Sequence, residues 1–360
     1  MSKIKLFDPY VDIHEERALL QTLKSHNWAS GAGGKNVEKF EYNFKKFVGA
    51  DDCIAVNSGT AALNLSLALH DYYDKEVIIP SLTFVATANA VVLNNAKPIF
   101  VDVDPKTLCL DTEQIKKAIT KKTKAIIPVH FAGMACNLDE IKEICKIHKL
   151  QLIEDAAHAT GTKYNKKRIG SHGNFVCFSF HPVKNLAMPT GGVIAINQND
   201  HKKIRKKLMA SRWCGITNRK DDNYDIKEAG WNYYMNEFSA AIGLTQLQKL
   251  EKTNKIRRQI AKKYFQMLEI EEKMPFNNSC SYHFYWIRVK NREKFRKKLK
   301  DKGIETGTHY KPIHTFSFYQ SKTKLPITEK IAKEIVSLPT HPNLSENNVE
   351  KIIKTVNNAI

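Results

Sequence analysis

Residues 153–192 read IEDAAHATGTKYNKKRIGSHGNFVCFSFHPVKNLAMPTGG, and this stretch decides which fold and site the chain can form. The apolar run 150–153 ends in Glu154 and Asp155, as a buried strand does when it delivers polar groups to its carboxyl edge. A second apolar run, 175–180, leads to Lys184. Ligands of open α/β sheets bind at that edge. The pattern therefore predicts a carboxylate and a lysine at the ends of two neighbouring strands.

The segment Ser-Phe-His-Pro-Val-Lys-Asn-Leu at 179–186 resembles the cofactor-binding segment of the DegT/DnrJ/EryC1/StrS family of sugar aminotransferases, which use pyridoxal 5′-phosphate. The resemblance implies that Lys184 forms a Schiff base with the cofactor and shuttles a proton, and that Asp155 keeps the pyridine nitrogen protonated. Such a lysine must lose its proton easily, which burial promotes. Taken alone, Asp155 would fit a helix cap and Lys184 would fit a solvated lysine. The presence of both in this stretch favours catalysis.

Composition is that of a globular protein of one large or two smaller domains, with 360 residues, 42% of them hydrophobic. No apolar stretch approaches the roughly 20 residues that span a bilayer, and the N-terminus lacks the apolar core of a signal peptide. The seven cysteines form no C-x-x-C pair, so neither a disulfide framework nor a zinc site is expected. We expect a cytoplasmic protein that binds neither membrane nor metal.

The net charge of +20, from 57 Lys and Arg against 37 Asp and Glu, makes nucleic-acid binding an alternative to consider. The basic residues gather in the runs 116–124, 201–207 and 294–302, each of which has the pattern of an amphipathic helix with lysines on its wet face. No RNA-binding signature or helix-turn-helix pattern stands out. We expect a solvated basic surface that modestly attracts anionic substrates, and no nucleic-acid partner.

Short apolar runs alternate along the chain with segments whose apolar residues recur at helical spacing, such as 37–48 and 138–148. This alternation predicts a mostly parallel sheet covered by helices. The predicted α/β domain matches the large domain of fold-type-I pyridoxal-phosphate enzymes. The seven strand candidates are 53–56, 77–79, 98–101, 125–129, 150–154, 175–180 and 193–196.

Two domains are predicted: an N-terminal arm with the large α/β domain at 1–254, and a small α+β domain at 255–360. A long amphipathic helix from 238 to 268 bridges them. In the second domain, residues 282–289 alternate like a strand with one buried face.

A turn rich in small residues, 57–62, follows the first strand and opens an apolar helix. Unpaired N–H groups at a helix N-terminus form a ready phosphate site, although an ordinary helix capped by Ser58 fits equally well. In the family that the chain resembles, the matching residues hold the cofactor phosphate. The resemblance therefore implies this role for Gly59, Thr60 and Ala61.

Further cofactor contacts are implied by the resemblance alone. Phe84 matches the aromatic residue that stacks on the pyridine ring, and His158 matches the residue that faces the ring's 3′-oxygen. Ser179 matches a phosphate-binding hydroxyl. Asn232 matches an asparagine that reaches the partner subunit's cofactor phosphate, so a homodimer with shared active sites is implied. Without the resemblance, Phe84 would be assigned to the core and His158 to a structural role.

Substrate contacts are implied in the same way. Trp28, Ser30 and Gly31 match a segment that lies beside the substrate, and His309 and Tyr310 match a pair near the sugar nucleotide. Taken alone, both segments would be ordinary turns.

The chain departs from the family pattern at two places. The family's Gly-Glu-Gly-Gly becomes 188–192, Met-Pro-Thr-Gly-Gly, which keeps the glycines and loses the acid. Tyr234 replaces the arginine of Gly-x-Asn-Tyr-Arg-Met, so another group must hold any anion that the arginine held. Elsewhere, Asp102 and Asp104 look like metal ligands, but turn formation before Pro105 explains them more simply.

The resemblance implies a homodimeric aminotransferase that moves an amino group from an amino acid, L-glutamate, to a nucleotide-linked keto sugar in ping-pong order. The product is an amino sugar for surface glycan or related biosynthesis. The alternatives are another fold-type-I reaction such as a lyase or desulfurase, a non-catalytic regulatory homologue, and a nucleic-acid-binding protein. A desulfurase needs a reactive loop cysteine, and none is clearly placed for that. A regulator would be free to lose Lys184 or Asp155, and both are present.

Overall fold

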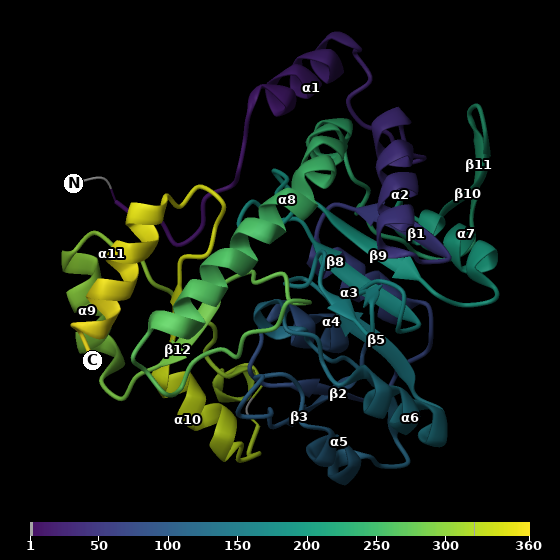
Figure 1. The fold of residues 1–360 in the computed structure, drawn as a ribbon. Coiled ribbons are helices and arrows are strands. Elements are labelled where there is room, and N and C mark those ends of the chain that lie inside the picture. The colour runs from purple at the N-terminus through teal and green to yellow at the C-terminus, as the bar shows by residue number, and fades with distance from the viewer. Residues whose placement is uncertain (1–2, 320) are drawn as a thin grey trace.

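The computed structural model describes residues 3–319 and 321–360, and a seven-stranded sheet forms its centre (Figure 1). Each predicted apolar run forms one strand, with ends that differ by a few residues. The strands are β1 Asp52–Val56, β2 Glu76–Pro80, β3 Lys97–Val101, β4 Thr123–Ile126, β5 Gln151–Asp155, β8 Phe175–Ser179 and β9 Gly192–Ile196. Their spatial order is β1-β9-β8-β5-β4-β2-β3. β9 runs antiparallel to both of its neighbours and the other pairs are parallel, which confirms the mostly parallel sheet.

Both faces of the sheet are buried. Successive residues of a strand point to opposite faces, and Cys53 and Ile54 of β1 accordingly belong to two different hydrophobic clusters. α3 (Gly59–Ala68) and α4 (Ala86–Leu93) supply one cluster, whereas α2 (Lys35–Val48) and α6 (Leu138–His148) supply the other. A sheet covered on both faces requires continuous apolar strands, which is why the runs were visible in the sequence.

The remaining helices are α1 Ile13–Lys24, α5 Thr112–Ala118, α7 His201–Ser211, α8 Glu237–Met267, α9 Arg292–Asp301, α10 Pro326–Glu334 and α11 Glu346–Asn357. Two of the three basic runs lie on α7 and α9 as predicted. The prediction of a helix over 116–124 is wrong beyond Ala118, because Ile119 is extended and a Thr123-to-Thr120 backbone hydrogen bond turns the chain into β4.

α8 runs without a break from the large sheet to the C-terminal part of the chain (Figure 1). Residue 254 lies inside α8, and the division into two domains stays a prediction. Beyond α8, β12 (Tyr285–Arg288) pairs antiparallel with β13 (Ile335–Leu338). Every residue of β12 is buried, so the prediction of one buried face is wrong. Helices α8 and α10 both pack against this strand, and Tyr264 of α8 meets Tyr285 at a ring distance of 5.3 Å.

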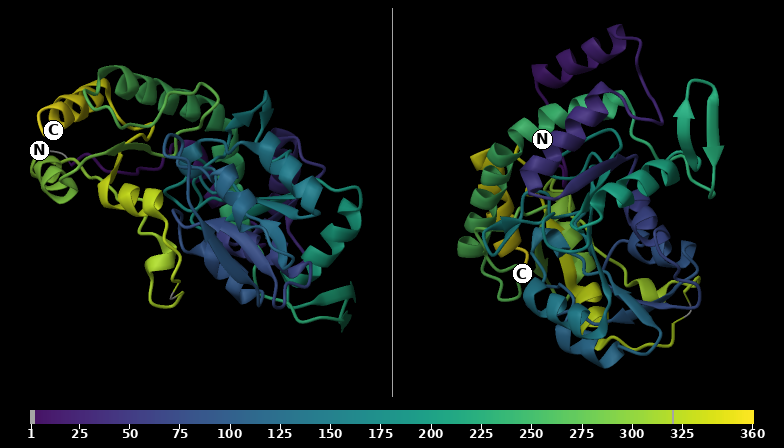
Figure 2. Two further views of the ribbon diagram at one scale, coloured as in Figure 1. Left: turned by 90° about the horizontal axis from the view of Figure 1, so that it is seen from below. Right: turned by 90° about the vertical axis from the view of Figure 1, so that its right-hand side faces the viewer.

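One segment stands away from the body of the molecule, the hairpin of β10 (Ile216–Lys220) and β11 (Asn223–Ile226) (Figures 1 and 2). α1 packs on α8, where its buried Glu15 accepts hydrogen bonds from Gln246 and Lys249. A short hairpin, β6 (Lys163–Tyr164) with β7 (Lys167–Arg168), precedes β8. None of the described helices is both long and apolar enough to cross a membrane.

Asp102 and Asp104 have different roles. Asp104 accepts hydrogen bonds from the backbone of Lys106 and Thr107, which confirms the predicted turn. Asp102 instead accepts from the backbone N–H groups of Ile327 and Thr328 and from the Thr328 hydroxyl, and so caps α10 from 225 residues away. Within 3–319 and 321–360, no group of three or more His, Cys, Asp or Glu residues is arranged to hold a metal ion.

Candidate active site

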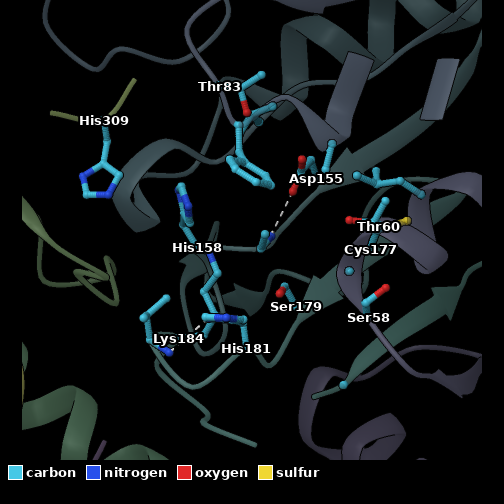
Figure 3. Close-up of a pocket in the computed structure, with 18 of the residues that line it drawn as sticks. Ser58, Thr60, Thr83, Asp155, His158, Cys177, Ser179, His181, Lys184 and His309 are labelled. Atoms are coloured by element: carbon cyan, nitrogen blue, oxygen red, sulfur yellow. Dashed lines mark hydrogen bonds between the residues drawn. The ribbon is translucent and has the colours of Figure 1, made fainter. Parts of the chain in front are cut away.

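A cavity of about 400 Å³ lies at the carboxyl edge of the sheet, where β5 and β8 end side by side (Figure 3). The N-terminus of α3, the loop before α4, Phe7 of the N-terminal arm and the pair His309 and Tyr310 complete its walls. The predicted site residues that line it are Gly59, Thr60, Phe84, Asp155, His158, Ser179, Lys184, His309 and Tyr310.

Asp155 is the last residue of β5, and its carboxylate is buried against the cavity. Its Oδ2 accepts a 2.8 Å hydrogen bond from the Thr87 hydroxyl, and its Oδ1 accepts one of 3.1 Å from the backbone of Ala157. Burial raises the pKa of Asp155, and the two hydrogen bonds oppose that rise. A buried carboxylate of this kind is best satisfied by a cationic partner such as a protonated pyridine nitrogen.

Lys184 lies in the loop after β8 and faces the same cavity (Figure 3). Burial lowers the pKa of its amine to about 8, although the Asp155 carboxylate acts in the opposite direction. The adjacent Asn185 anchors the loop, because its amide donates to Asn254 Oδ1 at 2.9 Å and to the carbonyl of Ser281 at 2.8 Å. At pH 7 about a tenth of the amine is therefore unprotonated. The hydrogen bonds of Asn185 hold the loop that carries it.

The N-terminus of α3 opens onto the cavity. Ser58 caps this helix by accepting the N–H of Ala61 at 3.1 Å, so the N–H groups of Gly59 and Thr60 are the ones left for a ligand. A Cβ on Gly59 would lie 2.6 Å from that of Ser179, so only glycine allows this close approach to β8. Ala61 was predicted as a third phosphate contact, but it does not line the cavity.

The outer wall is aromatic. Phe84 is 56% exposed, and its ring centroid lies 6.0 Å from that of Tyr310. The Tyr310 hydroxyl lies 3.1 Å from Nε2 of His158. His309 is hydrogen-bonded through Nδ1 to Ser337 at 2.8 Å, and burial lowers its pKa to about 4.

Thr190 stands where the family pattern has an acid. Its hydroxyl donates a hydrogen bond to the carbonyl of Asn57, which precedes α3. This contact joins the loop after Lys184 to the turn that opens α3.

Besides Ala61, five further positions that the resemblance pointed to lie outside the lining of this cavity. The indole N–H of Trp28 donates to the Leu23 carbonyl, and its ring packs 5.9 Å from Phe238. The others are Ser30, Gly31, Asn232 and Tyr234; Asn232 is exposed, and Tyr234 forms an isolated bridge with Val56.

Thr87 and Phe7 are among the residues of the site that were not predicted from the sequence. Thr87 bonds Asp155 from the start of α4, and its position three residues after Phe84 is the one local signal that could have indicated it. Phe7 lines the cavity from the N-terminal arm, which pairs with the C-terminal region through Ile4 and Ile304. Nothing in the sequence around Phe7 indicates this placement.

The donor set fits pyridoxal 5′-phosphate. Asp155 suits the pyridine nitrogen, Lys184 the aldehyde carbon, and the Gly59 and Thr60 N–H groups with the Ser179 hydroxyl suit the phosphate. The fold and this site define a fold-type-I pyridoxal-phosphate enzyme.

Comparison with known proteins identifies its family. Residues 10–357 match the DegT/DnrJ/EryC1/StrS aminotransferase family, and the chain belongs to it. The chain is 36% identical to the uncharacterized protein MJ1066 of Methanocaldococcus jannaschii, over 97% of this chain and 96% of that one.

Solved structures agree with this assignment. Helicobacter pylori PseC, an aminotransferase involved in the biosynthesis of pseudoaminic acid, matches with a TM-score of 0.94, at 26% identity over 99% of both chains. The putative sugar aminotransferase Spr1654 of Streptococcus pneumoniae, in its PMP form, matches with a TM-score of 0.94, at 27% identity over 99% of this chain and 97% of that one. A PLP form of Spr1654 matches as well. The protein is a pyridoxal-phosphate-dependent sugar aminotransferase.

Proposed function

We propose that this enzyme transfers the amino group of L-glutamate to a nucleotide-linked keto sugar and so produces an amino sugar. The proposal rests above all on one observation: Lys184 and Asp155 line a single cavity together with the free N-terminus of α3. When bound there, pyridoxal phosphate supplies an electron sink for the bonds that break at the substrate carbon.

Each of these residues has a separate role. Nζ of Lys184 takes the proton from the α-carbon of the donor and returns it on the cofactor side, and its lowered pKa suits both steps. Asp155 holds the positive charge of the pyridine nitrogen, since its buried carboxylate gains a cationic partner in this way. Phe84 and Tyr310 cover the reacting atoms and exclude water, and His309 contacts the sugar.

We propose a homodimer in which Trp28, Ser30, Gly31 and Asn232 complete the partner's cavity. Their position supports this: they do not line the cavity of their own chain, and Asn232 is exposed. The described residues that line the cavity include no arginine, and Tyr234 carries no charge. A partner subunit would then supply the cation for the substrate's carboxylate or phosphate groups.

We also propose that the enzyme works in the cytoplasm, on the path to a surface glycan or a related product. All seven cysteines are unpaired, as in a reducing compartment.

The test separates the two halves of the reaction. L-Glutamate added to the cofactor-loaded enzyme without a sugar should give about one 2-oxoglutarate per site, and sustained turnover should require a nucleotide-linked keto sugar. With both substrates, double-reciprocal plots should be parallel, as in a ping-pong reaction. A loaded enzyme that forms no 2-oxo acid from any amino acid would contradict the proposal and favour a regulatory homologue.

A further inference from the structure

His283 lies directly behind the cavity, two residues before β12, and its side chain is buried. Its ring stacks on His158, with 4.6 Å between the centroids and 30° between the planes. The same ring stacks on Phe7, at 5.1 Å and 16°. Residues from the N-terminal arm, the large sheet and the C-terminal region thus form one column of rings beside the cofactor site.

The backbone of Ala132 is hydrogen-bonded to both His158 and His283. Its N–H donates to Nδ1 of His158 at 3.3 Å, and its carbonyl accepts the N–H of His283 at 2.9 Å. Because Nδ1 accepts a hydrogen bond, the neutral ring must carry its hydrogen on Nε2. Nε2 in turn lies 3.1 Å from the Tyr310 hydroxyl, on the side of the cavity.

His158 is neutral in this environment. Burial lowers its pKa well below the ordinary value, and the charges of Lys184 and His309 act in the same direction. His283 is held neutral by burial and by the same lysine. His158 can therefore donate a hydrogen bond from Nε2 without carrying a positive charge.

The rings around His158 restrict its rotation. Phe131 meets it edge-on at 6.2 Å and 77°, and Phe284 does so at 5.5 Å and 69°. His283 covers its face. Nδ1 of His283 is itself buried without a hydrogen-bond partner among the described residues. His283 therefore contacts His158 through its ring face and not through Nδ1.

We propose that His283 is a positioning residue, whose ring face holds His158 with its Nε2–H directed at the Tyr310 hydroxyl and the cavity, where it would bind the ring oxygen of the cofactor. The inference rests on the proposed role of His158 in the cofactor site. It predicts that a flat apolar ring can replace His283, whereas a branched or small side chain cannot.

The test compares His283→Phe, which keeps a flat ring, with His283→Leu, which does not. The tautomer of His158 is read from the ring-nitrogen shifts of 15N-histidine-labelled protein without cofactor, and His158→Gln assigns the signals. The dissociation constant for pyridoxal phosphate is measured by equilibrium dialysis. His172→Leu serves as the control, because His172 lies outside the cavity lining.

We expect the phenylalanine variant to keep the Nε2–H signal and to bind the cofactor within about twofold of wild type. The leucine variant should show mixed tautomers and about tenfold weaker binding, as the loss of one hydrogen bond predicts. Should that variant fail to fold, as judged by circular dichroism, His283→Asn replaces it with the same expectation.

Equal impairment of the phenylalanine and leucine variants would overturn the inference, as would a leucine variant that matches wild type in both readouts. Wild-type protein that fails to bind pyridoxal phosphate would contradict the proposed function instead. The nitrogen shifts, which need no cofactor, would still decide whether His283 holds His158.

Discussion

The hydroxyl of Thr87 donates a 2.8 Å hydrogen bond to Oδ2 of Asp155, and both side chains are buried. This charge-assisted bond offsets part of the cost of burying the carboxylate. We expect Thr87→Val to weaken pyridoxal-phosphate binding about tenfold, because the pKa of Asp155 rises and the carboxylate pairs less well with a protonated pyridine nitrogen. Equilibrium dialysis measures the change. Thr87→Ser should bind nearly as wild type, and a valine variant with unchanged affinity would refute the role.

The amine of Lys184 should titrate far below an ordinary lysine. Burial disfavours its charged form and lowers its pKa to about 8, and only the neutral amine can bond the cofactor covalently. The rate of cofactor attachment, followed by visible absorption, should therefore rise with pH up to about 8 and then level off. Below that pH it should fall about tenfold per unit. Asp155→Asn should move the midpoint lower, since the carboxylate raises the pKa of Lys184; a wild-type midpoint near 10.5 would contradict this account.

Ser81 and His314 tie the C-terminal segment to the loop that carries Phe84. Ser81 Oγ accepts the N–H of His314 at 3.1 Å and lies 2.7 Å from its Nδ1, and all these groups are buried. We expect His314→Ala to lower the free energy of unfolding by about 1–3 kcal/mol, because it leaves a buried hydroxyl with one partner fewer. Cofactor affinity should also fall as Phe84 and Tyr310 shift.

Urea unfolding measures the first effect and dialysis the second. Phe318→Ala is the matched control in the same segment, because Phe318 is 71% exposed and should change neither quantity. If His314→Ala behaves like this control, the tie between the two segments contributes nothing.

Much of the fold could be predicted because its signals are local. Buried parallel strands are continuous apolar runs, so all seven were visible, and the bounds of α6 agree with the predicted 138–148. The same holds for the positions of the residues that we propose bind the cofactor. Asp155 ends β5, Lys184 follows the neighbouring strand β8, and Ser58 to Thr60 open α3. Each position is thus defined by the end of a strand or helix in its own segment.

The rest of the site depends on contacts between distant segments. Phe7 and His283 stack on each other although they lie far apart in the sequence, and neither lies in a pattern that indicates a cavity. Asp102 caps α10 from 225 residues away, whereas its own neighbourhood predicts a turn. Such contacts depend on how the C-terminal region packs against the sheet, and short-range periodicity carries no information about that packing.

The assignment of Lys184 can be tested by chemical trapping. The purified enzyme is loaded with pyridoxal phosphate, reduced with borohydride and digested, and the modified peptide is sequenced by mass spectrometry. Prior addition of L-glutamate should protect against labelling, and Lys184→Ala should take up no label. The account predicts that the cofactor mass lies on Lys184. Labelling of a different lysine, or none in a preparation that holds the cofactor, would contradict it.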